Sequence, residues 1–436
     1  MKVGVISLGC AKNLVDTENL LGILGAAGIE MVDEYTDAEA VIINTCGFIE
    51  SAKSEAIDTI LEAADHKNEK LKKLIVMGCL AQRYKPQLEE ELPEVDRFIA
   101  IDEYKDLGKI LSEELGVKIP NTYGKTPRIL SGKPWMAYLR IADGCSNRCS
   151  YCAIPLIRGD MRSFPEEDLV AEAERLVKSG VKELNLIAQD SSRYGFDWDG
   201  KLHLSSLLKK LDDLEGIRWI RILYLYPDEI PDDLIETIRS SKHILPYFDI
   251  PIQHGSDAML KRMHRRSNAA EIRNRTALIR KSFAHPVLRT TVMTGFPGET
   301  EEEHRQNVDL IREIRWNHLG SFTYSQEEDT PSASMPDDVP EEIKEKRKAE
   351  IMIMQEEISS ELLQEYVGTE QEVLIESRDG LTGMYLGRTA LYAPDGVDGV
   401  VRVRSEHELE YGSFVKCLIT RVNGHDLLAH CIEQEG

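Results

Sequence analysis

A compact cysteine motif constrains this chain more than any other feature. Cys145, Cys149 and Cys152 follow a predicted strand at C-x3-C-x2-C spacing. Thiolates are the usual protein ligands of iron–sulfur clusters, and three of them on a four-iron cluster leave one iron open to bind another molecule. A structural zinc site normally closes with four ligands, and neither a His nor a fourth Cys stands near this motif. The spacing therefore favours a 4Fe-4S cluster with an open iron, and zinc is the weaker alternative.

A second set of cysteines stands out once the strands of the first third of the chain are predicted. Each of the three follows closely on a buried strand: Cys10 after Lys2–Leu8, Cys46 after Ala40–Asn44 and Cys79 after Lys73–Met77. The carboxyl ends of parallel strands meet along one edge of a sheet, so these thiols are expected to converge. A single Cys is more often a small core residue than a ligand, but three at equivalent positions beside Gly favour a metal centre. Cys417 and Cys431 have no such partners, and we interpret them as core residues.

Strand and helix patterns alternate through most of the chain, which is typical of α/β folds with parallel sheets. Residues 1–117 are predicted to form an amino-terminal parallel α/β domain, with a further strand at Arg97–Ile101. A linker rich in Pro, Gly and Thr follows at 118–134, and residues 135–366 are predicted to form an incomplete (β/α)6 barrel. The six strands expected in this barrel are Met136–Ile141, Glu183–Ala188, Ile220–Tyr226, Tyr247–Ile252, Leu288–Met293 and Gly320–Tyr324.

Residues 367–436 have a different pattern, in which short Val-rich runs alternate with Gly and Asp turns. The runs are Glu372–Ile375, Val400–Val403 and Phe414–Val422. This pattern predicts a small antiparallel β-barrel. The segment carries 12 acidic against 6 basic residues, so a basic protein suits it better as a partner than bare nucleic acid.

Net charge and cysteine use narrow the class of protein further. A formal charge of −23 disfavours a broad phosphate-binding surface, because affinity for nucleic acid comes largely from Lys and Arg. The basic run Lys261–Arg266 could meet an anionic surface, although a solvated helix face or end is the commoner role of such a run.

Eight cysteines without a signal peptide indicate metal binding rather than disulfides. Apolar runs fall far short of the ~20 residues of a membrane helix, so we expect a cytoplasmic protein with no membrane partner.

Taken together, these motifs resemble the methylthiotransferase branch of the radical S-adenosylmethionine (SAM) superfamily over nearly the whole chain. The matching segments are Ser7-Leu8-Gly9-Cys10-Ala11-Lys12-Asn13, Asn44-Thr45-Cys46-Gly47, Gly78-Cys79, the C-x3-C-x2-C run, Ala188-Gln189-Asp190, Thr294-Gly295-Phe296-Pro297-Gly298-Glu299 and Tyr324-Ser325. The resemblance implies two 4Fe-4S clusters and a terminal TRAM module. It assigns an auxiliary cluster to Cys10, Cys46 and Cys79, and a SAM-cleaving cluster to Cys145, Cys149 and Cys152.

The resemblance also implies the chemistry. In such enzymes one SAM supplies a 5′-deoxyadenosyl radical, which removes hydrogen from an unactivated carbon, and a second SAM donates the methyl group. An external electron donor is required. Tyr151 is expected near the adenine, and Gln189, Asp190 and Arg289 are cofactor-binding candidates, although ordinary turn or core-edge hydrogen bonding explains these three equally well. No catalytic residue beyond the cluster ligands is indicated.

Members of this branch modify either tRNA adenosines or an aspartate of a small-subunit ribosomal protein. The segments that resemble the second group are Ala188-Gln189-Asp190, Arg221–Pro227, Asp249–His254 and Ala393–Gly399. They imply methylthio insertion at the aspartate β-carbon of a basic ribosomal protein, free or within the ribosome. A tRNA adenosine methylthiotransferase is the main alternative, and a non-catalytic iron–sulfur electron-transfer or structural protein is the alternative of a different class. One departure is Asp329, where relatives usually carry Gly before the Thr, since Asp tolerates fewer backbone conformations.

Overall fold

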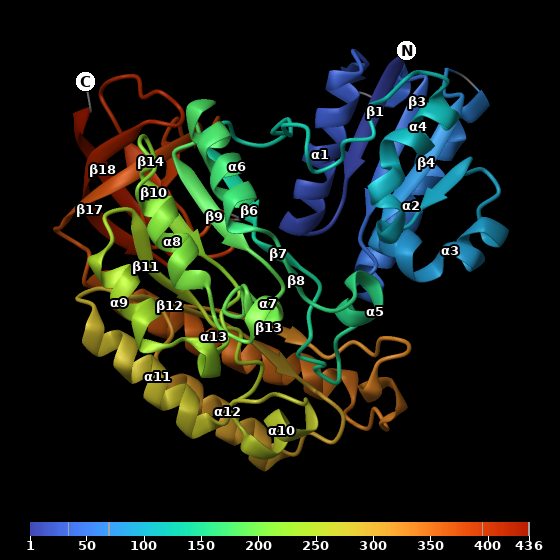
Figure 1. Ribbon diagram of the computed structural model, residues 1–436. Helices are drawn as coiled ribbons and strands as arrows, with labels where there is room; N and C mark the ends of the chain where they lie inside the picture. The colour runs from blue at the N-terminus through green and yellow to red at the C-terminus, as the bar shows by residue number, and fades with distance from the viewer. Residues whose placement is uncertain (34, 69, 395, 435–436) are drawn as a thin grey trace.

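The computed structural model describes residues 1–33, 35–68, 70–394 and 396–434, and it contains three sheets of substantial size (Figure 1). The predicted α/β fold, with an open barrel of parallel strands and a closed terminal barrel, is confirmed. Asp395, within the 393–399 segment, and the last two residues of the chain lie outside the described part. Among the described helices, none is long and apolar enough to cross a membrane.

The amino-terminal sheet is parallel, with strand order β2-β1-β3-β4-β5. Its strands are β1 (Lys2–Ser7), β2 (Glu30–Val32), β3 (Ala40–Thr45), β4 (Lys73–Gly78) and β5 (Arg97–Ile99). The helices of this domain are α1 (Ala11–Ala26), α2 (Glu50–Asp65), α3 (Cys79–Glu91) and α4 (Leu107–Leu115). Strand β3 is buried along its whole length because it lies at the centre of the sheet. Strand β2 was not predicted, because it is a short edge strand with two exposed residues.

The second sheet has six parallel strands in the order β13-β12-β11-β10-β9-β6, and its edge strands do not pair with each other. Its strands are β6 (Met136–Arg140), β9 (Glu183–Ile187), β10 (Trp219–Ile222), β11 (Ile244–Asp249), β12 (Val287–Thr294) and β13 (His318–Thr323). The helices are α5 (Ile154–Arg158), α6 (Glu166–Lys178), α7 (Phe196–Asp199), α8 (Leu204–Asp212), α9 (Asp232–Ser240), α10 (Asp257–Arg262), α11 (Ala269–Ser282), α12 (Glu301–Ile314) and α13 (Glu341–Gln364). All six predicted strands are present, and the barrel is incomplete as expected.

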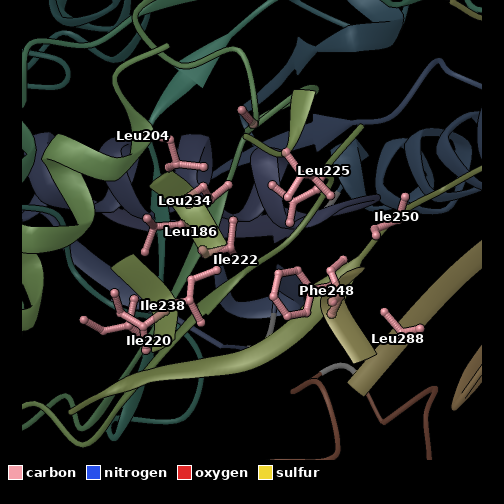
Figure 2. Close-up of a cluster of buried hydrophobic side chains, with 14 of the residues drawn as sticks. Leu186, Leu204, Ile220, Ile222, Leu225, Leu234, Ile238, Phe248, Ile250 and Leu288 are labelled. Carbon is pink, nitrogen blue, oxygen red and sulfur yellow. The ribbon is translucent and has the colours of Figure 1, made fainter. Parts of the chain in front are cut away.

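Successive side chains along these strands point to opposite faces of the barrel wall. One face packs against the helices in the main hydrophobic core, where Leu186, Ile222 and Phe248 meet Leu204 and Leu234 (Figure 2). The other, inner face includes Arg140 and Glu183, which pair with Asp16 of the amino-terminal domain and Arg388 of the terminal domain. The barrel therefore acts as the scaffold on which both outer domains are assembled.

The carboxy-terminal domain is a closed barrel with strand order β14-β15-β16-β18-β17. Its strands are β14 (Glu370–Arg378), β15 (Tyr385–Arg388), β16 (Val401–Arg404), β17 (Phe414–Asn423) and β18 (Asp426–Gln434). The barrel is antiparallel as predicted except for the β16–β18 pair, which is parallel. Cys417 is fully buried and lies opposite Cys431, which is partly buried, so both contribute to this core.

Buried charges join this domain to the inner face of the open barrel. Arg388 donates to Glu183 at 2.6 Å, and Arg221 lies 3.4 Å from the same carboxylate. Asp398 accepts hydrogen bonds from Arg289 and Tyr247. All six side chains are at most one-sixth exposed. Because an unpaired buried charge is costly, these contacts fix the terminal domain against the barrel.

Candidate cluster and SAM site

The loop with Cys145, Cys149 and Cys152 runs from the short strand β7 (Ala142–Asp143) to helix α5. Strand β7 pairs with β8 (Arg162–Ser163), and Cys145 N–H donates to the carbonyl of Gly159 at 3.0 Å, which closes the base of the loop. Gly144 has φ +74°, and a Cβ there would lie 2.2 Å from the carbonyl oxygen of Asp160. Only Gly satisfies both the conformation and the close approach.

The three thiols of this loop are close enough to influence one another electrostatically. Burial raises the pKa of Cys145 to about 11 and that of Cys152 to about 12. The Sγ atom of Cys149 lies 3.8 Å from both the Tyr226 hydroxyl and a guanidinium nitrogen of Arg265. Metal-bound cysteines are thiolates, so binding of a cluster here would release protons and stabilise the loop.

The basic run Lys261–Arg266 forms the end of α10 and the following turn, and its arginines are engaged by the protein itself. Arg262 pairs with Glu303 at 2.8 Å, and Arg266 pairs with Glu229 at 2.8 Å. Arg265 is buried, stacks on the Tyr226 ring at 4.0 Å and donates to the carbonyl of Pro251. The run therefore supports the cysteine loop, and its arginines do not form a free anion-binding face.

Polar side chains gather beside the cysteine loop at the carboxyl ends of the barrel strands. Asn147 donates to Asp190 at 2.7 Å, and Gln189 donates to Asp143 at 3.2 Å. The side-chain oxygens of Asn147, Gln189 and Gln253 are buried and accept no hydrogen bond within the described chain. Buried polar atoms normally have partners, so these three acceptors fit a polar ligand such as SAM. Tyr151 packs beside Met263 and Phe296 in a small apolar cluster next to the loop.

Arg289, a cofactor-binding candidate in the sequence, lies elsewhere on the inner face of the barrel. Its guanidinium contacts Asp249 at 3.3 Å and Asp398 of the terminal domain at 2.9 Å. The first contact lies within the open barrel, and the second links the barrel to the terminal domain. Arg289 is therefore left out of the residues that we assign to SAM.

The second set of thiols converges at the carboxyl edge of the amino-terminal sheet. The side-chain oxygen of Asn13 lies 4.0 Å from Cys10 Sγ and 3.4 Å from Cys79 Sγ. A Cβ on Gly9 would lie 2.6 Å from the Cβ of Cys46, which places the Cys10 turn directly against Cys46. Burial raises the pKa of Cys46, and it raises that of Cys79 to about 12. Three neighbouring thiols, with Cys46 and Cys79 buried and Cys10 exposed, fit the donor set of a second cluster.

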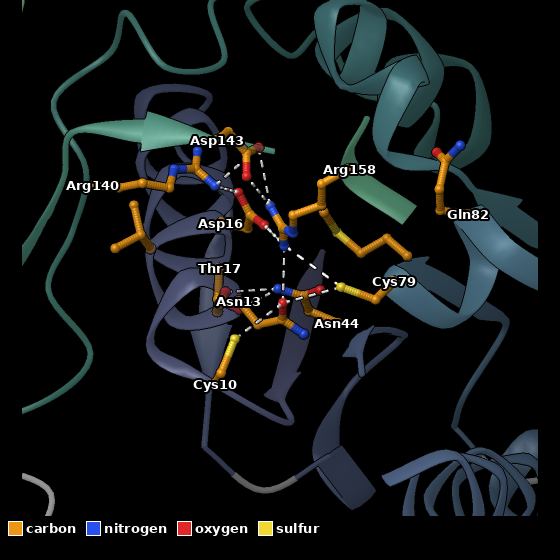
Figure 3. A network of polar contacts seen from close by, with 12 residues as sticks. Cys10, Asn13, Asp16, Thr17, Asn44, Cys79, Gln82, Arg140, Asp143 and Arg158 are labelled. Carbon is orange, nitrogen blue, oxygen red and sulfur yellow. Dashed lines mark hydrogen bonds and ion pairs between the residues drawn. The ribbon is translucent and has the colours of Figure 1, made fainter. Parts of the chain in front are cut away.

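A buried arginine, Arg158, connects the second set of thiols to Asp143 at the base of the first cysteine loop (Figure 3). Arg158 lies at the end of α5, the helix that follows Cys152, and its side chain is 2% exposed. It pairs with Asp16 at 2.8 Å and Asp143 at 3.2 Å, and it donates to Asn13 at 3.0 Å and towards Cys79 Sγ at 3.6 Å. One side chain thus joins the base of the first loop to the second set of thiols.

The sequence predicted that each set of thiols converges, but it did not indicate the roles of Arg158, Asp16, Arg265 and Tyr226. Packing of α1 against α5 brings Asp16 and Arg158 together across the domain boundary. Arg265 and Tyr226 reach Cys149 from loops that follow α10 and β10 of the open barrel. In the described residues, no group of three or more His, Cys, Asp or Glu side chains is arranged to hold a single metal ion. A four-iron cluster spaces its ligands more widely than one ion does, so the cluster assignment depends on the donor set.

Three thiols at the carboxyl edge of an open parallel barrel define a radical SAM enzyme. Family models match in the same order: the uncharacterized protein family UPF0004 at residues 2–100, the radical SAM superfamily at 139–311 and the TRAM domain at 367–432. The ribosomal protein uS12 methylthiotransferase RimO of Alkaliphilus oremlandii is 47% identical, and that of Clostridioides difficile is 44% identical; each alignment covers 98% of both chains. The chain belongs to the RimO family of radical SAM methylthiotransferases, and it binds SAM and a 4Fe-4S cluster.

Solved structures support the fold independently. The radical SAM methyltransferase TsrM of Kitasatospora setae, with cobalamin and a 4Fe-4S cluster bound, aligns with a TM-score of 0.55 at 13% identity over 76% of each chain. The cobalamin-dependent radical enzyme OxsB aligns with a TM-score of 0.51 at 14% identity, over 71% of this chain and 51% of its own. At these identities the likeness concerns the fold alone.

Proposed function

We propose that this enzyme inserts a methylthio group at the β-carbon of an aspartate in ribosomal protein uS12. The observation that carries the proposal is Arg158, which links the second set of thiols to the base of the first cysteine loop, in a chain whose relatives are named for that modification. Two centres suit a reaction that must both activate a C–H bond and deliver sulfur.

We assign the SAM-cleaving cluster to Cys145, Cys149 and Cys152, and the auxiliary cluster to Cys10, Cys46 and Cys79. When bound, the first cluster and SAM supply a reductive cleavage that lets hydrogen be removed from an unactivated carbon, and an external donor must provide the electron. The residues around the loop have supporting roles. Tyr151 offers an apolar wall for the adenine, and the unsatisfied oxygens of Asn147 and Gln189 would accept hydrogen bonds from SAM.

Charge favours a protein substrate over tRNA. The chain carries a net charge of −23, and 367–436 holds 12 acidic against 6 basic residues. A basic ribosomal protein, free or in the ribosome, complements such a surface, whereas tRNA would be repelled. A ribosomal protein substrate also places the reaction in the cytoplasm.

The test is anaerobic reconstitution with iron and sulfide, followed by addition of SAM, a strong reductant and an equal mixture of uS12 and tRNA. Mass spectrometry follows 5′-deoxyadenosine and the mass gain that corresponds to replacing H by SCH3. A gain on one uS12 aspartate supports the proposal, and a gain on tRNA alone transfers the function to the adenosine-modifying group. Absence of 5′-deoxyadenosine from a fully loaded enzyme would count against our assignment of the SAM-cleaving cluster.

A further inference from the structure

Lys12 is a buried cation that pairs with no anion among the described residues. It is the second residue of α1, two positions after Cys10, and it is 7% exposed. Its ammonium nitrogen lies 3.3 Å from the centroid of the Tyr224 ring, above the end of β10. Within the described part of the chain, Lys12 takes part in no ion pair or hydrogen bond, whereas its neighbours Arg140 and Arg158 both pair with Asp16.

Charged or ionisable groups of both domains lie near Lys12. Cys10 of the amino-terminal domain and Arg158, Asp249 and Asp143 of the open-barrel domain are close enough to influence its charge. Both carboxylates already bind other groups. Asp249 contacts Arg289 and accepts a hydrogen bond from Tyr224 N–H, and Asp143 pairs with Arg158. Neither is positioned as the counter-ion of Lys12.

An ammonium group in such a place is costly unless an anion joins it, because burial removes hydration that a cation–π contact replaces only in part. The substrate of the proposed reaction brings an anion to this region, since the target side chain is a carboxylate. Its carboxyl carbon is bonded directly to the β-carbon, so a contact that fixes the carboxylate also fixes the reacting carbon to within one bond length.

We propose that Lys12 binds the side-chain carboxylate of the target aspartate and thereby selects aspartate as the residue to be modified. This inference rests on the proposed function. It makes Lys12 a substrate-binding residue supplied by the amino-terminal domain, although the carbon to be modified enters the barrel.

The test is a double-mutant cycle between Lys12 and the target residue. Holoenzyme and its Lys12→Met variant are loaded with SAM and kept without reductant, so that binding is measured without turnover. Fluorescence anisotropy gives the Kd for full-length uS12 with the native aspartate and for uS12 with Asn at that position. Lys178→Met is the matched control, because Lys178 is an exposed lysine on α6. Iron content and SAM affinity are recorded for each protein.

We expect wild-type enzyme and Lys178→Met to prefer the aspartate form by roughly 10- to 100-fold, the usual range for a hydrogen-bonded charge. Lys12→Met should bind both forms equally, with unchanged iron content and SAM affinity. The proposal fails if the variant keeps the full preference, or if it loses SAM affinity instead. It also fails if wild-type enzyme binds both forms alike, a result that requires no folded variant. A wild-type enzyme that cleaves SAM but never modifies uS12 would contradict the proposed function itself, and the role of Lys12 would be contradicted for that reason.

Discussion

The Arg158→Met substitution should break the link between the two sets of thiols, while Cys145, Cys149 and Cys152 still bind their cluster. The guanidinium is held by Asp16, Asp143 and Asn13, and its removal leaves two buried carboxylates short of a cation. Breaking a buried ion pair from one side costs about 3–5 kcal/mol. Arg140 remains 2.6 Å from Asp16 and 3.9 Å from Asp143, so we expect a smaller loss of unfolding free energy, about 2–3 kcal/mol.

Two assays check this prediction. Urea titration followed by circular dichroism measures the stability of the cluster-free protein under anaerobic conditions, with Arg305→Met as control. Arg305 forms an exposed ion pair with Glu302, so its variant should unfold at the wild-type midpoint. After reconstitution, Arg158→Met should still produce 5′-deoxyadenosine but hold less iron and modify uS12 poorly. A stability change below about 0.5 kcal/mol with full methylthio transfer would refute the bridging role of Arg158.

Three further predictions concern the cysteine loop and the terminal domain. Cys149→Ala should abolish 5′-deoxyadenosine formation, whereas Cys46→Ala should retain some while blocking sulfur insertion; joint loss of both activities in a folded Cys46→Ala protein would contradict separate roles. Gly144→Ala should lower iron binding because its Cβ would collide with the Asp160 carbonyl, and Gly132→Ala, which meets no atom within 4 Å, should not. Burial opposes ionisation of Asp398, but His318 and Arg289 outweigh it and lower its pKa to about 2 from 3.8. The ionised Asp398 carboxylate therefore stabilises the folded state by roughly 2 kcal/mol. This stabilisation is complete above pH 4 and is lost as the pH falls through 2. The free energies of unfolding of wild type and Asp398→Asn should therefore differ at neutral pH and converge near pH 2.

Ligand spacing and hydrophobic patterning were enough to predict the six barrel strands and both sets of thiols. The C-x3-C-x2-C run is a local signal, and the second set could be found because each Cys follows a strand in a parallel sheet. Strand β2 could not be predicted, because three mostly exposed edge residues carry no pattern. The parallel pairing of β16 with β18 could not be predicted either, because the positions of short strands in a sequence do not determine the direction in which they pair in a closed barrel.

Side chains that act across domain boundaries were the hardest to predict. Arg289 was a reasonable cofactor candidate by position, but its charge is used by Asp249 and Asp398. The arginines near Cys149 suggested an anionic partner, yet Arg265 turns inward and Arg266 pairs with Glu229. Charge in a sequence shows that a partner is needed but not where that partner lies. Asp329 has φ +61°, so the position at which the sequence resemblance predicts Gly adopts the left-handed conformation with Asp.

The buried link between Glu183 and Arg388 has a consequence for how this enzyme can be re-engineered. A chimaera that receives a terminal barrel without a counterpart of Arg388 would leave the Glu183 carboxylate facing Arg221 alone. Grafts would therefore misassemble before any change of specificity could be observed. A transplant that carries the barrel residues along with the terminal domain is the design that this interface requires.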